Sequence, residues 1–148
     1  MSWIGFVIFL VATIAYIWNG KDSFTKKEWV VFFVKYLMLL IGTVLVVVMV
    51  SGILKVWPFI TVSTAKHATS TLAVSFTTIL ACKFAVVMIV TIFERIMTFH
   101  KKYNTEKNYN FLISLVTKHG SGFLLFSKVI VSLGSLPILY GIWFGRTV

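Results

Sequence analysis

Residues 71–93 carry the sequence TLAVSFTTILACKFAVVMIVTIF, an apolar run that contains a single charge, Lys83. A helix that crosses a membrane needs about 20 mainly apolar residues, with a range of about 17–25. This stretch meets that requirement, so it predicts a membrane-spanning helix. Three further stretches of the same kind decide the fold class together with it.

The other three apolar stretches run from Trp3 to Trp18, from about Val30 to Leu54, and from about Gly122 to Phe144. Tryptophan side chains favour the membrane interface, and the five tryptophans lie near the predicted ends: Trp3, Trp18, Trp29, Trp57 and Trp143. We therefore predict an all-α membrane protein, a four-helix transmembrane bundle that forms one membrane domain over residues 1–148.

The composition agrees with this class. Of the 148 residues, 59% are hydrophobic and 12% are charged, and the mean hydropathy is +0.96. A soluble domain has about 25% charged residues, and a disordered chain is less hydrophobic still. Cys82 is the only cysteine, so no disulfide can form within the chain. The sequence contains no catalytic, nucleotide-binding or metal-binding motif, so we expect a protein that is not an enzyme and holds neither metal nor cofactor.

The net charge of +10 comes from 14 Lys and Arg against 4 Asp and Glu. Eight of the basic residues lie in the first and third connections: Lys21, Lys26, Lys27, Arg95, Lys101, Lys102, Lys107 and Lys118. Three lie on the other side: Lys55, Lys66 and Arg146. Basic loops remain on the cytoplasmic side, so we predict a bacterial inner-membrane protein with both termini outside the cytoplasm. The charge then indicates topology and contact with anionic lipid headgroups, and not a nucleic-acid partner.

The third connection has a helical pattern of its own. Apolar side chains recur at positions i, i+3, i+4 and i+7: Tyr109, Leu112, Ile113 and Val116. This spacing predicts a short amphipathic cytoplasmic helix over about residues 105–118, between the third and fourth spans. Flanking lysines suit it to lie on anionic headgroups. The alternative is that it packs on the cytoplasmic end of the bundle.

Lys83 lies eleven residues before Glu94, about 16 Å into the span at a rise of 1.5 Å per residue. Lys35 and Lys128 lie nearer to the ends of their spans, so we expect their ammonium groups to reach the interface. The four acids all lie in the predicted cytoplasmic loops: Asp22, Glu28, Glu94 and Glu106. The sequence therefore predicts a counter-charge for Lys83 from another subunit, a lipid headgroup or water. The alternative is that Lys83 also reaches the interface.

Small residues form a stripe on each of the last two predicted spans. On the third span they are Thr71, Ser75, Thr78 and Cys82. On the fourth span they recur every seven residues, at Gly120, Ser127, Gly134 and Gly141. Small residues let membrane helices approach closely, so close packing is favoured over a polar permeation path. The seam on the fourth span could lie within the chain or between subunits.

These features favour a non-catalytic protein that binds another membrane component, either another protein or a second copy of itself. Small basic polytopic proteins of this kind include exclusion and immunity proteins, which block a phage, plasmid or toxin translocation machine. Accessory subunits of membrane complexes have the same character. A holin-like pore or small anion-selective channel is a further alternative, if the intramembrane lysines share a lumen. The candidate partner-binding residues are Lys83, Gly134, Gly141, Lys101 and Lys102.

Overall fold

The computed structural model describes residues 2–56, 61–103 and 120–145, and the regular structure in these residues is helical. The helices are α1 (Ser2–Asn19), α2 (Lys26–Val56), α3 (Val62–Tyr103) and α5 (Gly120–Phe144). Each of these four helices is long and apolar enough to cross a membrane. The predicted helical class is confirmed, and the structure is compatible with an integral membrane protein.

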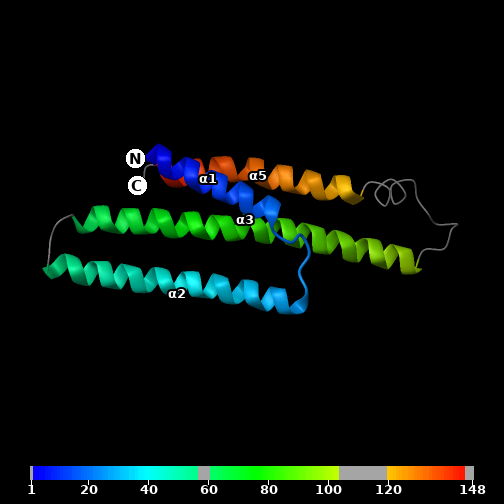
Figure 1. Ribbon diagram of the computed structural model, residues 1–148, viewed down its shortest axis with the longest axis horizontal. Helices are drawn as coiled ribbons and strands as arrows, with labels where there is room; N and C mark the ends of the chain where they lie inside the picture. The colour runs from blue at the N-terminus through cyan, green and yellow to red at the C-terminus, as the bar shows by residue number, and fades with distance from the viewer. Residues whose placement is uncertain (1, 57–60, 104–119, 146–148) are drawn as a thin grey trace.

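The central helix is α3, with α2 along one side of it and α1 and α5 along the other (Figure 1). Helices α1 and α3 run in one direction, and α2 and α5 run in the other (Figure 1). The first turn of α1 and the last turn of α5 lie together, because the ring centroids of Trp3 and Phe144 are 4.5 Å apart. The helical parts of the chain therefore begin and end at the same end of the bundle, which we call the terminal end.

The third helix is longer than predicted at both ends. It begins at Val62 and not at 71, and it ends at Tyr103 and not at 93. Thr61 starts it, since its hydroxyl accepts the backbone N–H of Thr64 at 3.3 Å. The Ser/Thr-rich stretch that follows is helical, and its hydroxyls find acceptors within the helix, as Thr69 Oγ1 does by donating to the carbonyl of Ala65 at 2.9 Å. Hydropathy marks the part of a helix that suits lipid, and not where the helix ends.

The second helix begins four residues before the predicted Val30. The backbone N–H of Thr25 donates to Glu28 Oε2 at 2.8 Å, and the backbone N–H of Glu28 donates to Thr25 Oγ1 at 3.4 Å. This reciprocal pair is a capping box. The helix ends at Val56, two residues after the predicted Leu54. The predicted amphipathic helix over 105–118 lies outside the described residues.

The apolar core lies between α1, α3 and α5. Its buried members are Ile17, Cys82, Val86 and Val90, with Leu124 and Val131 packed against them. The small-residue stripe of α3 faces inward, since Ser75 is fully buried and Thr78 is 7% exposed. Their hydroxyls donate to the carbonyls of Thr71 and Val74 within the same helix. The stripe therefore serves close packing, as favoured from the sequence.

The fourth helix buries Ser127 of the seven-residue seam but not Gly134 or Gly141. It buries instead a stripe that starts at Ser127 and advances by four residues, through Ser135 to Leu139. At about 100° per residue, each step of four turns about 40° one way, and each step of seven turns about 20° the other way. The two stripes therefore diverge along the helix, and Gly134 and Gly141 lie exposed. A Cβ atom added at either glycine would meet nothing within 4 Å in the described residues.

Candidate functional site: a buried charge cluster

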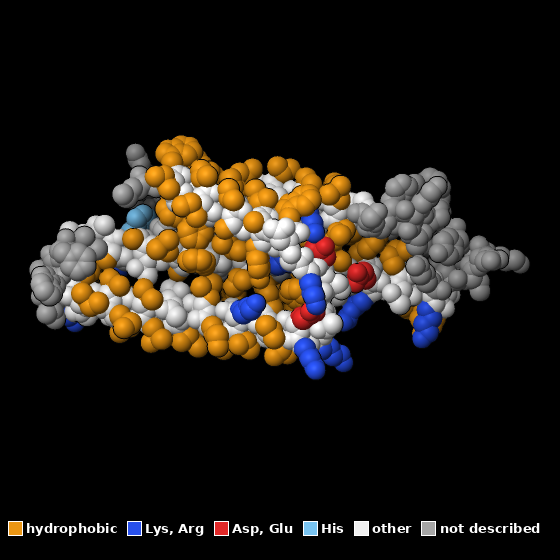
Figure 2. All heavy atoms as spheres, viewed as in Figure 1, with side chains coloured by type: hydrophobic (Ala, Val, Ile, Leu, Met, Phe, Trp, Pro, Cys, Tyr) orange, Lys and Arg blue, Asp and Glu red, His pale blue; other side chains and the backbone are white. Residues whose placement is uncertain are grey.

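Three charged side chains meet inside the apolar core, and we call them the Asp22 cluster: Asp22, Lys83 and Lys128. Lys83 comes from the middle of α3 and Lys128 from the first half of α5. Asp22 comes from the connection that follows α1, which ends at Asn19. Figure 2 shows basic and acidic side chains gathered around the level of this connection, with apolar surface to the terminal side.

One carboxylate serves two ammonium groups. Asp22 Oδ2 lies 2.8 Å from Lys128 Nζ, and Asp22 Oδ1 lies 3.4 Å from Lys83 Nζ. Lys83 is 1% exposed and Lys128 is 8% exposed. Two cations and one anion leave a formal charge of +1 in the cluster, and buried charges persist only when they are paired and hydrogen-bonded.

The C-terminus of α1 supplies a further partner. Lys83 Nζ donates to the backbone carbonyl of Ile17 at 3.2 Å. This carbonyl is one of the last four of α1, which have no partner within the helix, and it lies at the negative end of the helix dipole. Lys83 therefore satisfies the end of α1 and joins it to α3.

Gly20 permits the close approach of Lys83 to the chain. A Cβ atom at this position would lie 2.9 Å from Lys83 Cε and 3.0 Å from its Nζ. On the other side of the cluster, Lys128 Nζ lies 5.8 Å from the centroid of the Trp18 ring, within the range of a cation–π interaction. The Trp18 indole N–H in turn donates to Ser132 Oγ at 3.3 Å. The residues around the end of α1 thus hold α3 and α5 together.

The first connection also contacts α3 farther along. Ser23 Oγ donates to Glu94 Oε2 at 3.0 Å, while Lys21 pairs with Glu28. Gly20 and Ser23 therefore lie against Lys83 and Glu94, eleven residues apart on α3. The first connection therefore passes from α1 to α2 with polar contacts to α3.

Two expectations about the lysines are wrong. Lys83 does have an acid at its own depth, because the first connection enters the bundle and brings Asp22 to it. Lys128 is buried against the same carboxylate and does not extend to an interface. Lys35 is exposed on α2, where its extension toward an interface stays a prediction.

The sequence held a signal for Asp22 that hydropathy alone did not use. A span over 3–18 is about 24 Å long at 1.5 Å per residue, shorter than the hydrocarbon core of about 30 Å. A polar connection that follows so short a helix begins within the hydrocarbon core, before the chain reaches the membrane interface. For that reason, Asp22 in the Gly20-Lys21-Asp22 sequence could have been predicted as the counter-charge of Lys83.

The other candidate residues lie apart from the cluster. Gly134 and Gly141 lie on the exposed face of α5. Lys102 is exposed near the end of α3, with its Nζ 5.3 Å from the Tyr103 ring centroid, and Lys101 precedes it in the same turn. Lys83 and Lys102 are separated by about 28 Å of helix at 1.5 Å per residue. The structure does not bring the five candidates together into one site.

Comparison with protein-family models, with characterised proteins and with solved structures finds no match to this chain. Within the described residues, no group of three or more His, Cys, Asp or Glu side chains is placed to hold a metal ion. Geometry and charge are therefore the grounds on which a function can be argued.

Proposed function

We propose that this chain is a non-catalytic polytopic membrane protein that acts by binding another membrane component through its helix faces. The version we favour is an exclusion- or immunity-type inhibitor of a phage, plasmid or toxin translocation machine. The observation that carries the proposal is the outward position of Gly134 and Gly141 on α5. Small residues on an open face allow a second helix to approach closely, and nothing in the described part of the chain occupies that place.

The position of the intramembrane lysines weighs against a channel. Lys83 and Lys128 point toward Asp22 from two sides, and Lys35 is exposed on α2. In this arrangement the three cations do not line a common lumen. A ring of basic side chains around a pore is what anion selectivity requires.

The distribution of charge supports the proposed orientation. The end of the bundle away from the terminal end carries Lys21, Lys26, Lys27, Arg95 and Lys102, whereas Lys55 and Lys66 lie toward the terminal end. The positive-inside rule places the more basic end in the cytoplasm. We therefore propose the inner membrane of a bacterium, with both termini outside the cytoplasm.

The test is cross-linking from the open face of α5. A photoreactive amino acid replaces Ile138, which is 52% exposed and lies one turn from both glycines. A matched probe replaces Val48 of α2, which is 63% exposed. The proposal expects one discrete adduct from position 138 that Gly134→Leu and Gly141→Leu abolish, while Gly42→Leu leaves it unchanged.

The identity of the adduct separates the versions of this proposal. A component of a phage, conjugation or toxin machine supports the exclusion type, and a respiratory or secretion subunit supports an accessory subunit. A second copy of this chain would indicate a homo-oligomer. Recovery of an unlinked monomer from both positions, or depolarisation of the membrane on expression, would contradict the proposal.

A further inference from the structure

We propose that the groove between α2 and α3 binds an anionic phospholipid, with one acyl chain along the groove and the phosphate on Lys66. The inference is independent of the partner-binding face on α5. It depends on the way α2 and α3 pack, on the residues that line the gap between them, and on a cation at one end of that gap.

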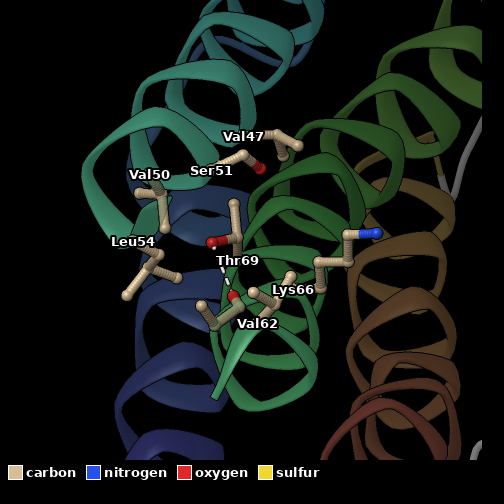
Figure 3. A pocket seen from close by; sticks show the side chains of 8 residues that line it. Val47, Val50, Ser51, Leu54, Val62, Lys66 and Thr69 are labelled. Carbon is tan, nitrogen blue, oxygen red and sulfur yellow. Dashed lines mark hydrogen bonds between the residues drawn. The ribbon is translucent and has the colours of Figure 1, made fainter. Parts of the chain in front are cut away.

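The two helices touch at both ends and separate between them. Toward the terminal end, Leu54 and Ala65 are each 5% exposed, and the space between the helices there is about 10 Å³. Figure 3 shows this end, where Val50 and Leu54 of α2 lie beside Val62 of α3. At the other end the rings of Phe32 and Phe84 stack with centroids 5.9 Å apart.

Between these contacts lies an open groove of about 500 Å³, and Figure 2 shows the molecule hollowed between α2 and α3. The long walls of the groove are mainly apolar: Leu40, Val44, Val47, Ala73 and Val74. Thr43 and Thr77 also line it, and their hydroxyls donate to backbone carbonyls of their own helices. Binding sites for small ligands have volumes of about 300–1,000 Å³. A bilayer does not leave such a space empty, and its apolar walls suit a hydrocarbon chain.

The terminal end of the groove is polar. Lys66 and Ser70 line it, and Figure 3 shows the Lys66 side chain directed away from the close contact of the two helices. A separate space of about 210 Å³ lies on the α5 side of Ser70, between α3 and Gly141 of α5, and is not part of this groove. The groove therefore has a hydrogen-bonding end and a hydrocarbon end, as an amphiphile does.

Lys66 lies at a depth where a lipid phosphate can reach it. It is four residues from the start of α3 at Val62, about 6 Å along the helix axis. A lysine this close to the end of a membrane helix extends its ammonium group to the interface, where the lipid phosphates lie.

The charge of the surroundings favours an anionic headgroup. The acids that the structure describes are Asp22, Glu28 and Glu94, and their ion pairs are with Lys21, Lys83 and Lys128. Glu94 lies about 42 Å from Lys66 along α3 at 1.5 Å per residue. Within residues 2–56, 61–103 and 120–145, Lys66 has no carboxylate partner, so its counter-charge comes from outside this part of the chain.

The test uses the full chain in vesicles with a photoactivatable group in the lipid acyl chain. One probe is phosphatidylglycerol, which is anionic, and the other is phosphatidylcholine with the same acyl chains. Mass spectrometry maps the labelled residues. We expect phosphatidylglycerol to label the groove walls, at Val44 and Ala73, more strongly than Val48 on the outer face of α2.

Two variants and their controls separate headgroup from chain. Lys66→Gln lowers groove labelling by phosphatidylglycerol about fivefold, the effect of one basic residue near a charged surface. It lowers labelling by phosphatidylcholine less, because the choline cation offsets the charge of that lipid's phosphate. Ala73→Trp fills the groove and removes labelling by both lipids. The controls are Lys35→Gln, an exposed lysine outside the groove, and Val48→Trp, and both keep the wild-type pattern.

Three outcomes would overturn the inference. Equal labelling of Val44 and Val48 would mean contact with bulk lipid only. Unchanged labelling in both Lys66→Gln and Ala73→Trp would mean that neither the charge nor the groove selects the lipid. A disulfide between two copies of a Val44→Cys variant, in vesicles without a labelled groove, would assign the groove to a second chain.

Discussion

The two sides of α3 are packed in different ways. On one side, α1 and α5 bury apolar side chains against α3 and contribute to the Asp22 cluster. There the Trp143 ring of α5 packs directly on Gly5 of α1. On the other side, α2 touches α3 at its two ends and leaves about 500 Å³ between them. Among the α2 side chains that the structure describes, Phe32 and Leu54 are the buried apolar ones, and Leu54 borders the close contact near the terminal end.

The difference follows from the residues on each side. The side toward α1 and α5 combines small residues, hydroxyl groups and charges, which hold helices together where lipid competes with apolar contacts. The α2 sequence around Val44–Val50 is branched and apolar all round, so lipid solvates it as well as a protein would. We therefore call the α1–α3–α5 side the locked side and the α2 side the open side. Substitutions on the locked side should change the stability of the protein more than matched substitutions on the open side.

Asp22→Asn should have the largest effect, because it leaves Lys83 and Lys128 buried without a carboxylate. Removing one partner of a buried ion pair costs about 3–5 kcal/mol, and we expect about 3 kcal/mol because the Asp22 side chain keeps 25% of its exposure. Unfolding by sodium dodecyl sulfate, followed by tryptophan fluorescence, measures the change. Glu94→Gln is the control and should cost less than 1 kcal/mol, as is usual for exposed charges. Equal effects of the two variants would contradict a locked side.

Gly5→Ala should come next. A Cβ atom there would lie within 2.2–2.8 Å of three ring atoms of Trp143, so the ring or the two helices would have to move, and overpacking costs about 1–3 kcal/mol. The matched change on the open side is Gly42→Ala, where nothing lies within 4 Å. That change should stabilise the helix by up to about 1 kcal/mol. The same unfolding titration measures the change in the free energy of unfolding for both variants. If both variants lose stability, or both gain it, the two sides of α3 do not differ in the way proposed.

Leu139→Ala and Leu45→Ala compare the same deletion on the two sides. Leu139 is fully buried against the locked side, and Leu45 is 57% exposed on α2. Buried leucines cost about 2–5 kcal/mol in water-soluble proteins. In lipid the transfer contribution falls away, so we expect about 1–2 kcal/mol for Leu139 and nearly none for Leu45. Thermal denaturation in mild detergent provides the ranking, and a larger loss at Leu45 would reverse the account.

Lys128→Met should have the smallest effect on the locked side. It removes the 2.8 Å ion pair with Asp22 but leaves Asp22 and Lys83 as a neutral pair. Replacement of a buried ion pair member that leaves no unpaired charge is often close to neutral, so we expect a change below about 1 kcal/mol. A loss as large as that of Asp22→Asn would show that Lys128, and not Lys83, is the principal partner of the carboxylate.

The sequence predicted the elements better than the contacts between them. Four apolar segments predicted four helices, because hydropathy and length decide whether a segment suits a membrane. Their ends were less accurate, since the capping box at Thr25 and the helical Ser/Thr stretch after Thr61 depend on hydrogen bonds that hydropathy ignores. The partner of Lys83 was missed because Asp22 is 61 residues away in the chain and was placed with the loops.

The seam on α5 shows a different limit. Ser127, Gly134 and Gly141 form a row of small residues at seven-residue spacing. This spacing alone does not indicate whether the row faces another helix of this chain or the outside of the bundle. The four-residue stripe to Leu139 is equally visible in the sequence, and only the positions of α1 and α3 decide which of the two is buried.

The most direct test of the locked side is a double-mutant cycle between Asp22 and Lys83 in the Lys128→Met background. That background leaves one carboxylate and one ammonium in the cluster, so each single change leaves an unpaired charge and the double change leaves none. We predict that Asp22→Asn and Lys83→Met are coupled by at least about 1 kcal/mol in the free energy of unfolding, within the range for residues in contact. Additive effects within about 0.5 kcal/mol would contradict the claim that Asp22 is the counter-charge of Lys83.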